Sequence, residues 1–293
     1  MLHLIDASVF VFRAYYSVPA SLADRDGNPV NAVYGFARFL VELLGRAAPV
    51  HIAVAFDESL TSSWRTRIYP AYKANRELPP ADLAQQFVLC REFCGLLGLA
   101  AYGHADYEAD DIIGTLAVQA RAAGMTAALV TRDKDLAQLV RPGDHFWDYI
   151  ADRRFGYDEI PERFGVAAER IADYLALTGD AVDNIPGVPG VGKKTAATLL
   201  RHFESLEHLY DRLEDVPALK LRNGAWVADQ LRDHREAAFL ARQLTAITCD
   251  MPLTAPIADL ERRAADLTAL DEFFDRLGFG PLLRGQVRRI RSA

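Results

Sequence analysis

The stretch that decides the fold is His51-Ile52-Ala53-Val54-Ala55-Phe56-Asp57, a short run of β-forming and small apolar residues that stops at an aspartate. A run of this length is typical of a strand that is buried on both faces of a sheet. The same arrangement occurs twice more. Leu2–Ile5 runs into Asp6, and Thr126–Thr131 runs almost to Asp133. The sequence therefore predicts three buried strands that each end at or near an acidic residue.

Helical patterns separate these runs, with apolar residues three and four positions apart over Asn31–Gly45, Asp82–Leu97 and Asp110–Ala123. A further strand is predicted over His145–Tyr149. Strands that alternate with helices form a mostly parallel, doubly wound sheet. We therefore predict an α/β fold whose functional side chains lie beyond the carboxyl ends of the strands, where sites form in such sheets.

The chain becomes helical after about residue 160. Helices are predicted over Phe164–Leu177, Lys193–Phe203, Trp226–Leu244 and Leu267–Leu277. We expect an α/β domain over residues 1–163, a helical module over 164–260, and a C-terminal helical segment over 261–293 that packs back on the first domain.

One segment, from Arg65 to Pro80, interrupts the α/β rhythm. In it four basic residues interleave with two tyrosines, and prolines stand at three points. Such a segment is typical of an arched insertion beside the sheet edge, which we place at about residues 64–82. An ordinary solvated surface loop is the alternative.

Composition limits the class of protein. The chain has 293 residues, of which 51% are hydrophobic, and a formal net charge of −7. No apolar run approaches the roughly 20 residues that span a bilayer, and the N-terminus lacks the basic region of a signal peptide. The cysteines, Cys90, Cys94 and Cys249, are odd in number and form no CxxC pair, which favours a reducing cytosol.

Carboxylates are concentrated on the short connections of this plan. They are Asp6, Asp57, Glu108, Asp110, Asp111, Asp133, Asp135, Asp180 and Asp183. Each one taken singly is explained as a turn residue or a helix cap. Together at one sheet edge they would repel one another strongly unless cations compensated them.

This set of acids predicts a metal centre. Oxygen ligands favour Mg²⁺ or Mn²⁺ over zinc, and none of the seven histidines shows zinc-ligand spacing. The acids exceed the needs of one ion, so we expect two or more ions, an arrangement that activates water for phosphodiester cleavage. The net charge then reflects the metal site and does not argue against a nucleic-acid partner.

A glycine-rich turn occupies Gly187-Val188-Pro189-Gly190-Val191-Gly192-Lys193-Lys194-Thr195. It fails the Walker A pattern, because Lys194 stands where Ser or Thr is required and no buried strand precedes it. We interpret it as a helical hairpin that grips a sugar-phosphate backbone through its glycines, the following helix and two lysines. A surface turn between core helices is the alternative.

Several motifs, in this order, resemble the 5′ nuclease (flap endonuclease) family, which includes the bacterial 5′→3′ exonuclease domain of DNA polymerase I and its stand-alone relatives. They are Leu4-Ile5-Asp6-Ala7-Ser8, Phe12-Arg13-Ala14-Tyr15, Ala32-Val33-Tyr34-Gly35-Phe36, Phe56-Asp57, Tyr72-Lys73-x-x-Arg76, Tyr107-Glu108-Ala109-Asp110-Asp111, Asp133-Lys134-Asp135-Leu136 and Thr178-Gly179-Asp180-x-x-Asp183-Asn184-Ile185-Pro186-Gly187. The resemblance covers nearly the whole chain.

The resemblance implies a PIN-like α/β domain followed by a helix–three-turn–helix module that also binds potassium through backbone carbonyls. Six of the acids fall on the family's metal positions, and Asp135, Asp180 and Asp183 fall on a second, outer group. Lys73 and Arg76 match the arch through which a 5′ single strand passes. Lys73, with Arg65 and Arg76, is expected to stabilise charge on the scissile phosphate, and Asp111 is expected to be essential for turnover.

The resemblance also supplies expected DNA contacts. They are Phe12, Arg65, Tyr72, Lys73, Arg76, Gly187, Gly190, Gly192, Lys193, Lys194 and Thr195. Phe12 departs from the family, since many relatives carry a tyrosine there, but a phenylalanine can still stack on a base. Arg132 occupies a position that is often small.

The leading hypothesis is therefore a metal-dependent 5′ nuclease that hydrolyses DNA at 5′ flaps, nicks and branch points. The alternatives are a non-catalytic, structure-specific DNA-binding protein and a PIN-type ribonuclease. The complete set of acids favours catalysis. The expected setting is a monomer in the bacterial cytoplasm, at the nucleoid and away from membranes, with a DNA polymerase as candidate partner. Whether the chain stands alone or belongs to a longer polymerase stays open.

Overall fold

The computed structural model describes residues 1–58 and 62–290 and contains a six-stranded sheet with strand order β3-β2-β1-β4-β5-β6. The strands are β1 (Leu2–Asp6), β2 (His51–Asp57), β3 (Ala100–His104), β4 (Ala127–Val130), β5 (His145–Asp148) and β6 (Arg153–Gly156). β1 to β5 run parallel to their neighbours, and only β6 is antiparallel. The predicted mostly parallel sheet is confirmed.

Two strands, β3 and β6, were not predicted. Every residue of β3 is half-buried and its sequence, Ala-Ala-Tyr-Gly-His, lacks a strongly apolar run. β6 has two exposed arginines among its four residues. Both are outer strands of the sheet, where one side of the strand needs no neighbour, so their sequences carry a weaker hydrophobic signal.

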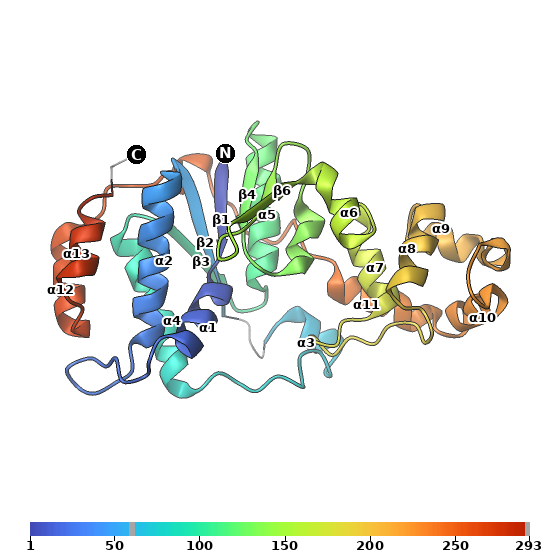
Figure 1. Ribbon diagram of the computed structural model, residues 1–293, viewed down its shortest axis with the longest axis horizontal. Coiled ribbons are helices and arrows are strands. Elements are labelled where there is room, and N and C mark those ends of the chain that lie inside the picture. The colour runs from blue at the N-terminus through green and yellow to red at the C-terminus, as the bar shows by residue number, and fades with distance from the viewer. Residues whose placement is uncertain (59–61, 291–293) are drawn as a thin grey trace.

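Helices cover both faces of the sheet, as Figure 1 shows. One face carries α1 (Ala7–Ser17), α2 (Asn31–Ala47) and α4 (Ala81–Leu96), and the other carries α5 (Ala109–Ala122). Successive strand residues point to opposite faces, so Leu4 packs on the α5 side and Ile5 on the α2 side. Because both faces are buried, the central strands are apolar throughout.

A helical module follows the sheet and extends the molecule to one side (Figure 1). Its helices are α6 (Ile160–Phe164), α7 (Ile171–Thr178), α8 (Lys193–His202), α9 (Leu206–Asp211), α10 (Gly224–Asp233) and α11 (Arg235–Thr245). Two predicted helices are in fact interrupted. The helix predicted over 164–177 is broken at Gly165, whose left-handed φ of 81° ends α6, and α7 starts only at Ile171. The helix predicted over 226–244 is broken at His234, between α10 and α11.

The chain then returns to the sheet. Helices α12 (Leu267–Leu277) and α13 (Pro281–Val287) contact α4 and α2, and the rings of Phe93 and Phe273 lie 5.8 Å apart between centroids. The range predicted for α12 is confirmed. Of the helices in the described part of the chain, none is long and apolar enough to cross a membrane.

The arginine- and tyrosine-containing insertion starts with a short helix, α3 (Trp64–Ile68), and continues as turns up to α4. The Ser63 hydroxyl caps α3 by accepting a hydrogen bond from the backbone amide of Arg65 at 3.2 Å. In Figure 1 the insertion runs past the ends of the strands, between the sheet and the helical module. It therefore lies beside the edge where the sequence places the acids.

Candidate functional site

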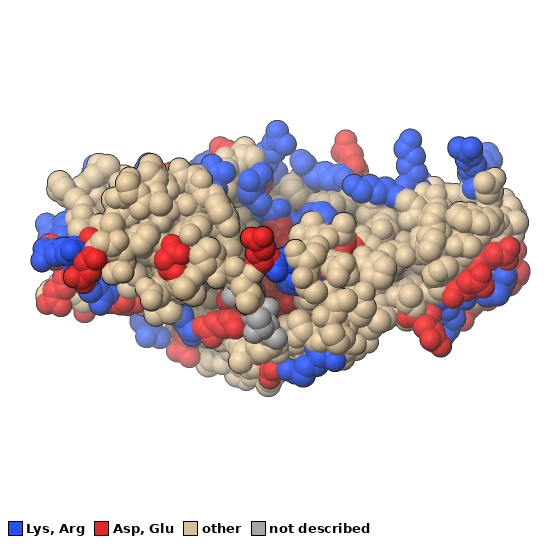
Figure 2. All heavy atoms as spheres, turned by 90° about the horizontal axis from the view of Figure 1, so that it is seen from below, with Lys and Arg blue, Asp and Glu red and all other residues tan. Residues whose placement is uncertain are grey.

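A cavity of about 260 Å³ lies at the carboxyl edge of the sheet. Its acidic lining residues are Glu77 of the insertion and seven acids that the sequence singled out, which are Asp6, Asp57, Glu108, Asp110, Asp133, Asp135 and Asp183. Figure 2 shows acidic side chains in the hollow between the two parts of the molecule, with basic side chains beside them. The structure thus brings together seven of the nine acids that the sequence singled out.

Parallel pairing explains why the strand-end acids meet. Asp6 is the last residue of β1 and Asp57 the last of β2, and these strands are neighbours. The Thr131 hydroxyl donates to Asp6 Oδ2 at 2.8 Å, and the Ser8 hydroxyl donates to Asp57 Oδ2 at 2.7 Å. Ser8 and Thr131 were not predicted as site residues, although both lie within or beside the strand-end motifs.

The acids disturb one another's ionisation. Burial, and then the nearby Asp57 carboxylate, raise the pKa of Asp6 to about 7. Burial and Asp133 raise the pKa of Asp135 to about 7. The pKa of Asp110 is also raised, by burial and by Asp133. Ionising these carboxyl groups together is therefore unfavourable, and a cation that enters the cavity would stabilise their ionised forms.

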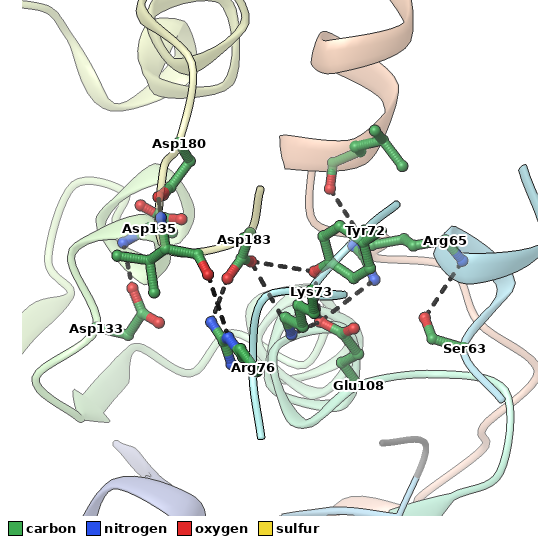
Figure 3. Close-up of polar contacts among 12 residues, drawn as sticks. Ser63, Arg65, Tyr72, Lys73, Arg76, Glu108, Asp133, Asp135, Asp180 and Asp183 are labelled. Atoms are coloured by element: carbon green, nitrogen blue, oxygen red, sulfur yellow. Dashed lines mark hydrogen bonds and ion pairs between the residues drawn. The ribbon is translucent and has the colours of Figure 1, made fainter. Parts of the chain in front are cut away.

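Basic side chains already offset part of this charge, as Figure 3 shows. Lys73 Nζ lies 2.8 Å from Glu108 Oε2 and 4.0 Å from Asp183 Oδ2. The Arg76 guanidinium also contacts Asp183. Burial alone would lower the pKa of Lys73, but these two carboxylates outweigh burial and raise it. Both predicted arch cations therefore reach the acidic cavity.

One acid of the outer group, Asp180, does not line the cavity. Lys134 Nζ lies 2.9 Å from Asp180 Oδ2 and 3.1 Å from Asp135 Oδ1, so the lysine bridges the two carboxylates. Burial would raise the pKa of Asp180, but the hydrogen bond from Lys134 and its charge lower it. Lys134 belongs to one of the motifs, yet it was not predicted as a site residue.

Asp111 and Arg65 differ most from expectation. Asp111 is fully buried and Arg65 is 3% exposed, and neither lines the acidic cavity. They form a two-pronged ion pair, with Nη1 to Oδ2 at 2.7 Å and Nη2 to Oδ1 at 2.8 Å. The structure therefore contradicts a DNA contact by Arg65 and leaves no free face of Asp111 for a metal ion.

Tyr72, predicted as a DNA contact, is only 4% exposed. Its hydroxyl lies 3.0 Å from Glu108 Oε2 and 3.2 Å from Asp183 Oδ2 (Figure 3). Tyr72 therefore lines the cavity between these two acids, with little of its surface exposed. Phe12 lines the cavity and its ring meets that of Phe87 edge to face, with centroids 5.5 Å apart.

The insertion is fastened to the loop that follows α7. The backbone amide of Lys73 donates to the Asp183 carbonyl at 2.9 Å, and Asn184 Nδ2 donates to the Ala71 carbonyl at 2.7 Å. Lys73 and Asn184 both have left-handed backbones, with φ of 54° and 56°. We call these contacts the interdomain clasp, because they join the two parts of the chain at the cavity.

The glycine-rich turn connects α7 to α8 as predicted, and its glycines have different roles. A Cβ on Gly187 would lie 2.4 Å from the Thr178 carbonyl carbon, so close packing requires this glycine. Gly190 has a φ of 76°, and a Cβ there would lie 2.1 Å from the Trp226 ring. Gly192 caps α8 and has open space around it. The remaining predicted residues of the turn are Lys193 and Lys194, which are exposed, and Thr195, which is half-buried.

The chemistry of the cavity fits a hard divalent cation, since its acidic side chains offer only carboxylate oxygens and repel one another. Within residues 1–58 and 62–290, however, no group of three or more acidic, histidine or cysteine side chains is arranged to hold a metal ion. The cavity is an open cluster whose carboxylates are partly paired with Lys73 and Arg76.

Comparison with known proteins decides the family. The model of the 5′-3′ exonuclease N-terminal, resolvase-like domain matches residues 1–165, and that of the 5′-3′ exonuclease C-terminal SAM fold matches residues 166–268. The chain belongs to the 5′-3′ exonuclease family. This membership confirms the resemblance seen in the motifs and, with it, the nuclease class and an α/β domain followed by a helical one.

The relatives of this 5′-3′ exonuclease family member include DNA polymerases. DNA polymerase I of Rhizobium leguminosarum is 38% identical over 290 residues, which cover 97% of this chain and 28% of that protein. DNA polymerase I of Bacillus caldotenax is 37% identical over 284 residues, which cover 96% of this chain and 32% of that protein. The chain thus spans about a third or less of the length of these relatives.

Solved structures share the fold. The T5 D15 protein aligns with a TM-score of 0.68 at 17% identity, covering 99% of both chains. The catalytic core of Rad2 aligns with a TM-score of 0.65 at 15% identity, covering 98% of this chain and 90% of that one. At such identities the likeness shows the arrangement of elements and no more.

Proposed function

We propose that this family member is a divalent-metal-dependent 5′ nuclease that hydrolyses DNA at 5′ ends, flaps and nicks. The observation that carries the proposal is the acidic cavity, where seven of the predicted carboxylates meet two basic side chains from the insertion. The T5 D15 neighbour was co-crystallised with metal ions, and the Rad2 core was solved in complex with a DNA substrate. Both facts support the same chemistry here.

The residues that line the cavity would have separate roles in hydrolysis. When bound by these carboxylates, divalent ions would activate water and stabilise the leaving oxygen of the phosphodiester. Asp6, Asp57, Asp110 and Asp133 would hold them. Lys73 and Arg76 would turn toward the scissile phosphate once their carboxylate partners are engaged, and would stabilise the charge that develops there.

The glycine-rich turn would hold the duplex. Gly192 leaves the first amides of α8 accessible, and Lys193 and Lys194 are exposed beside them. These are the features of a phosphate-binding helix terminus. Figure 2 shows basic side chains projecting from one edge of the helical module and acidic ones gathered on the other. A polarised module of this kind would orient a DNA backbone.

Finer assignments are also proposals. We propose Mg²⁺ as the natural ion, two or more ions per site, and a potassium ion bound by backbone carbonyls at the turn. The proposed setting is a monomer at the nucleoid of the bacterial cytoplasm that acts next to a DNA polymerase. The polymerase I relatives support the setting next to a polymerase, and the carboxylate side chains of the cavity support Mg²⁺.

The deciding experiment measures product lengths on 5′-flap, nicked, gapped and RNA substrates with Mg²⁺, and then with excess chelator. We expect flaps or short 5′-terminal products to be released by hydrolysis, leaving 5′-phosphates, and the reaction to stop with chelator. Cutting that survives the chelator would refute the metal dependence, and preferential RNA cleavage would favour a ribonuclease. Tight, structure-selective binding with no turnover in any divalent ion would favour a binding protein.

A further inference from the structure

The ion pair between Arg65 and Asp111 is saturated with hydrogen bonds. Besides both arginine contacts, Asp111 Oδ1 accepts from the Thr248 amide at 2.9 Å and Oδ2 accepts from the Glu108 amide at 3.2 Å. Each carboxylate oxygen therefore has two donors. A metal ion or a water could bind Asp111 only after these contacts were broken, so the side chain is not placed to act in the chemistry.

Arg65 uses two further donors on the carboxyl end of α11. Nε donates to the Leu244 carbonyl at 2.9 Å, and Nη2 donates to the Ala246 carbonyl at 3.0 Å. Carbonyls at a helix carboxyl end lack partners within the helix, and the helix dipole favours a cation there. Arg65 thus serves as the C-terminal cap of a helix 179 residues away in sequence.

The pair connects three parts of the chain that each lead to the cavity. Asp111 holds the Glu108 amide at the start of α5, where Glu108 and Asp110 point into the cavity. Arg65 lies on α3, at the start of the insertion that carries Lys73. The end of α11 packs on α7, which leads directly into the loop carrying Asp183.

We propose that Arg65 and Asp111 are positioning residues that set the separation between the α5 acids and the acid group of the helical module. They bind neither DNA nor metal. This inference rests on the proposed function, because it concerns the geometry of that site. It predicts that the two residues act as a unit: removing either one breaks the same set of contacts, so removing the second adds little.

The test is a double-variant cycle with R65M, D111L and R65M/D111L. We expect each single variant to lower the single-turnover rate about 100-fold, the size expected when acids shift by about 1 Å. The double variant should be no more than about tenfold slower than the slower single variant, far short of the roughly 10,000-fold that two independent effects would give. The flap-DNA affinity of all three variants in chelator should stay within about twofold of the parent.

Amide hydrogen exchange gives a readout that does not depend on activity. In metal-free protein the two single variants and the double variant should all expose the backbone amides of Lys73 and Ile185, which donate to the Asp183 and Asp180 carbonyls. If the parent does not cut DNA but the exchange pattern holds, the proposed function fails and the positioning role stands. If the parent cuts DNA but the pattern is absent, the positioning role fails.

A matched control lies at the other end of α5. Arg121 donates to Asp144 Oδ2 at 2.5 Å, and Asp144 is buried. D144N should lower the melting temperature without changing the rate or the exchange of the Asp183 contact. Two single effects that multiply in the double variant, or single variants that slow cleavage without exposing these amides, would overturn the inference, because one member would then act directly. Should the single variants not fold, R65K, which keeps the charge, replaces R65M in the same comparison.

Discussion

Replacing Tyr72 with phenylalanine removes one oxygen atom from the wall of the acidic cavity. The Tyr72 hydroxyl lies near two carboxylates, at 3.0 Å from Glu108 and 3.2 Å from Asp183, but it has a single hydrogen to donate. It therefore stabilises one carboxylate at a time and holds the two acids, which belong to different domains, at a fixed separation. Y72F keeps the ring and its packing, so its effect isolates this hydroxyl.

The magnitude follows from the environment of the hydroxyl. A hydrogen bond to a charged group contributes about 1.5–3 kcal/mol, and this one is buried. A loss of about 2 kcal/mol would lower the melting temperature of the metal-free protein by about 4–8 °C. If the same energy is lost from the arrangement of the acids during cleavage, the single-turnover rate falls about 10- to 100-fold.

Tyr149 supplies the matched control. Its hydroxyl donates to Glu42 Oε1 at 3.0 Å, it is also buried, and it does not line the acidic cavity. Y149F should lower the melting temperature less than Y72F, because Glu42 is exposed, and should leave the rate within about twofold of the parent. Thermal melting and single-turnover cleavage of a 5′ flap measure both effects. A Y72F protein that cleaves as fast as Y149F would refute the role of the hydroxyl in spacing the acids.

Three further predictions test other parts of the site. G190A should lower duplex affinity about tenfold, because residue 190 has a left-handed backbone and the added Cβ would collide with Trp226. G192A should fold normally, because the space around Gly192 is open, and thermal melting with DNA titration separates the two variants. The raised pKa of Asp6 means that its folded form holds a proton up to about pH 7, so its favourable contribution is complete below about pH 4 and is lost as the pH rises through 7. D6N should consequently raise the melting temperature of metal-free protein more at pH 8 than at pH 5, and an equal gain at both pH values would contradict the shift. K73A should slow cleavage at saturating DNA by about 100-fold while changing DNA affinity little. Single-turnover rates and DNA binding in chelator measure the two effects. A change in binding alone would show that Lys73 does not stabilise charge on the scissile phosphate.

The sequence predicted the central strands and the meeting of their acids because parallel strands place their carboxyl ends at one edge. Asp6 and Asp57 needed only that rule. The outer strands escaped prediction, since β3 and β6 have small or charged residues and their pairing depends on neighbours far away in sequence. The break at His234 between α10 and α11 was likewise not predicted, because no glycine or proline marks it in the sequence.

The pairing of side chains was beyond sequence reasoning for a different reason. Asp111 and Asp110 are adjacent acids at one helix start, and only the position of α3 and the end of α11 decides that Asp111 points away from the cavity. Arg65 and Arg76 are both basic residues of one insertion, yet Arg65 is buried and Arg76 is exposed. Burial is a property of the assembled fold, and local composition does not encode it.

The interdomain clasp bears on how such proteins can be recombined. The boundary between the two family domains falls at residues 165 and 166, and a gene fusion made there would look harmless. But Lys73 and Ala71 from one parent would then face Asp183 and Asn184 from the other, across hydrogen bonds that require two left-handed backbones. Chimaeras of distant homologues should therefore exchange these two loops together, as a single inherited unit, whatever happens at the linker.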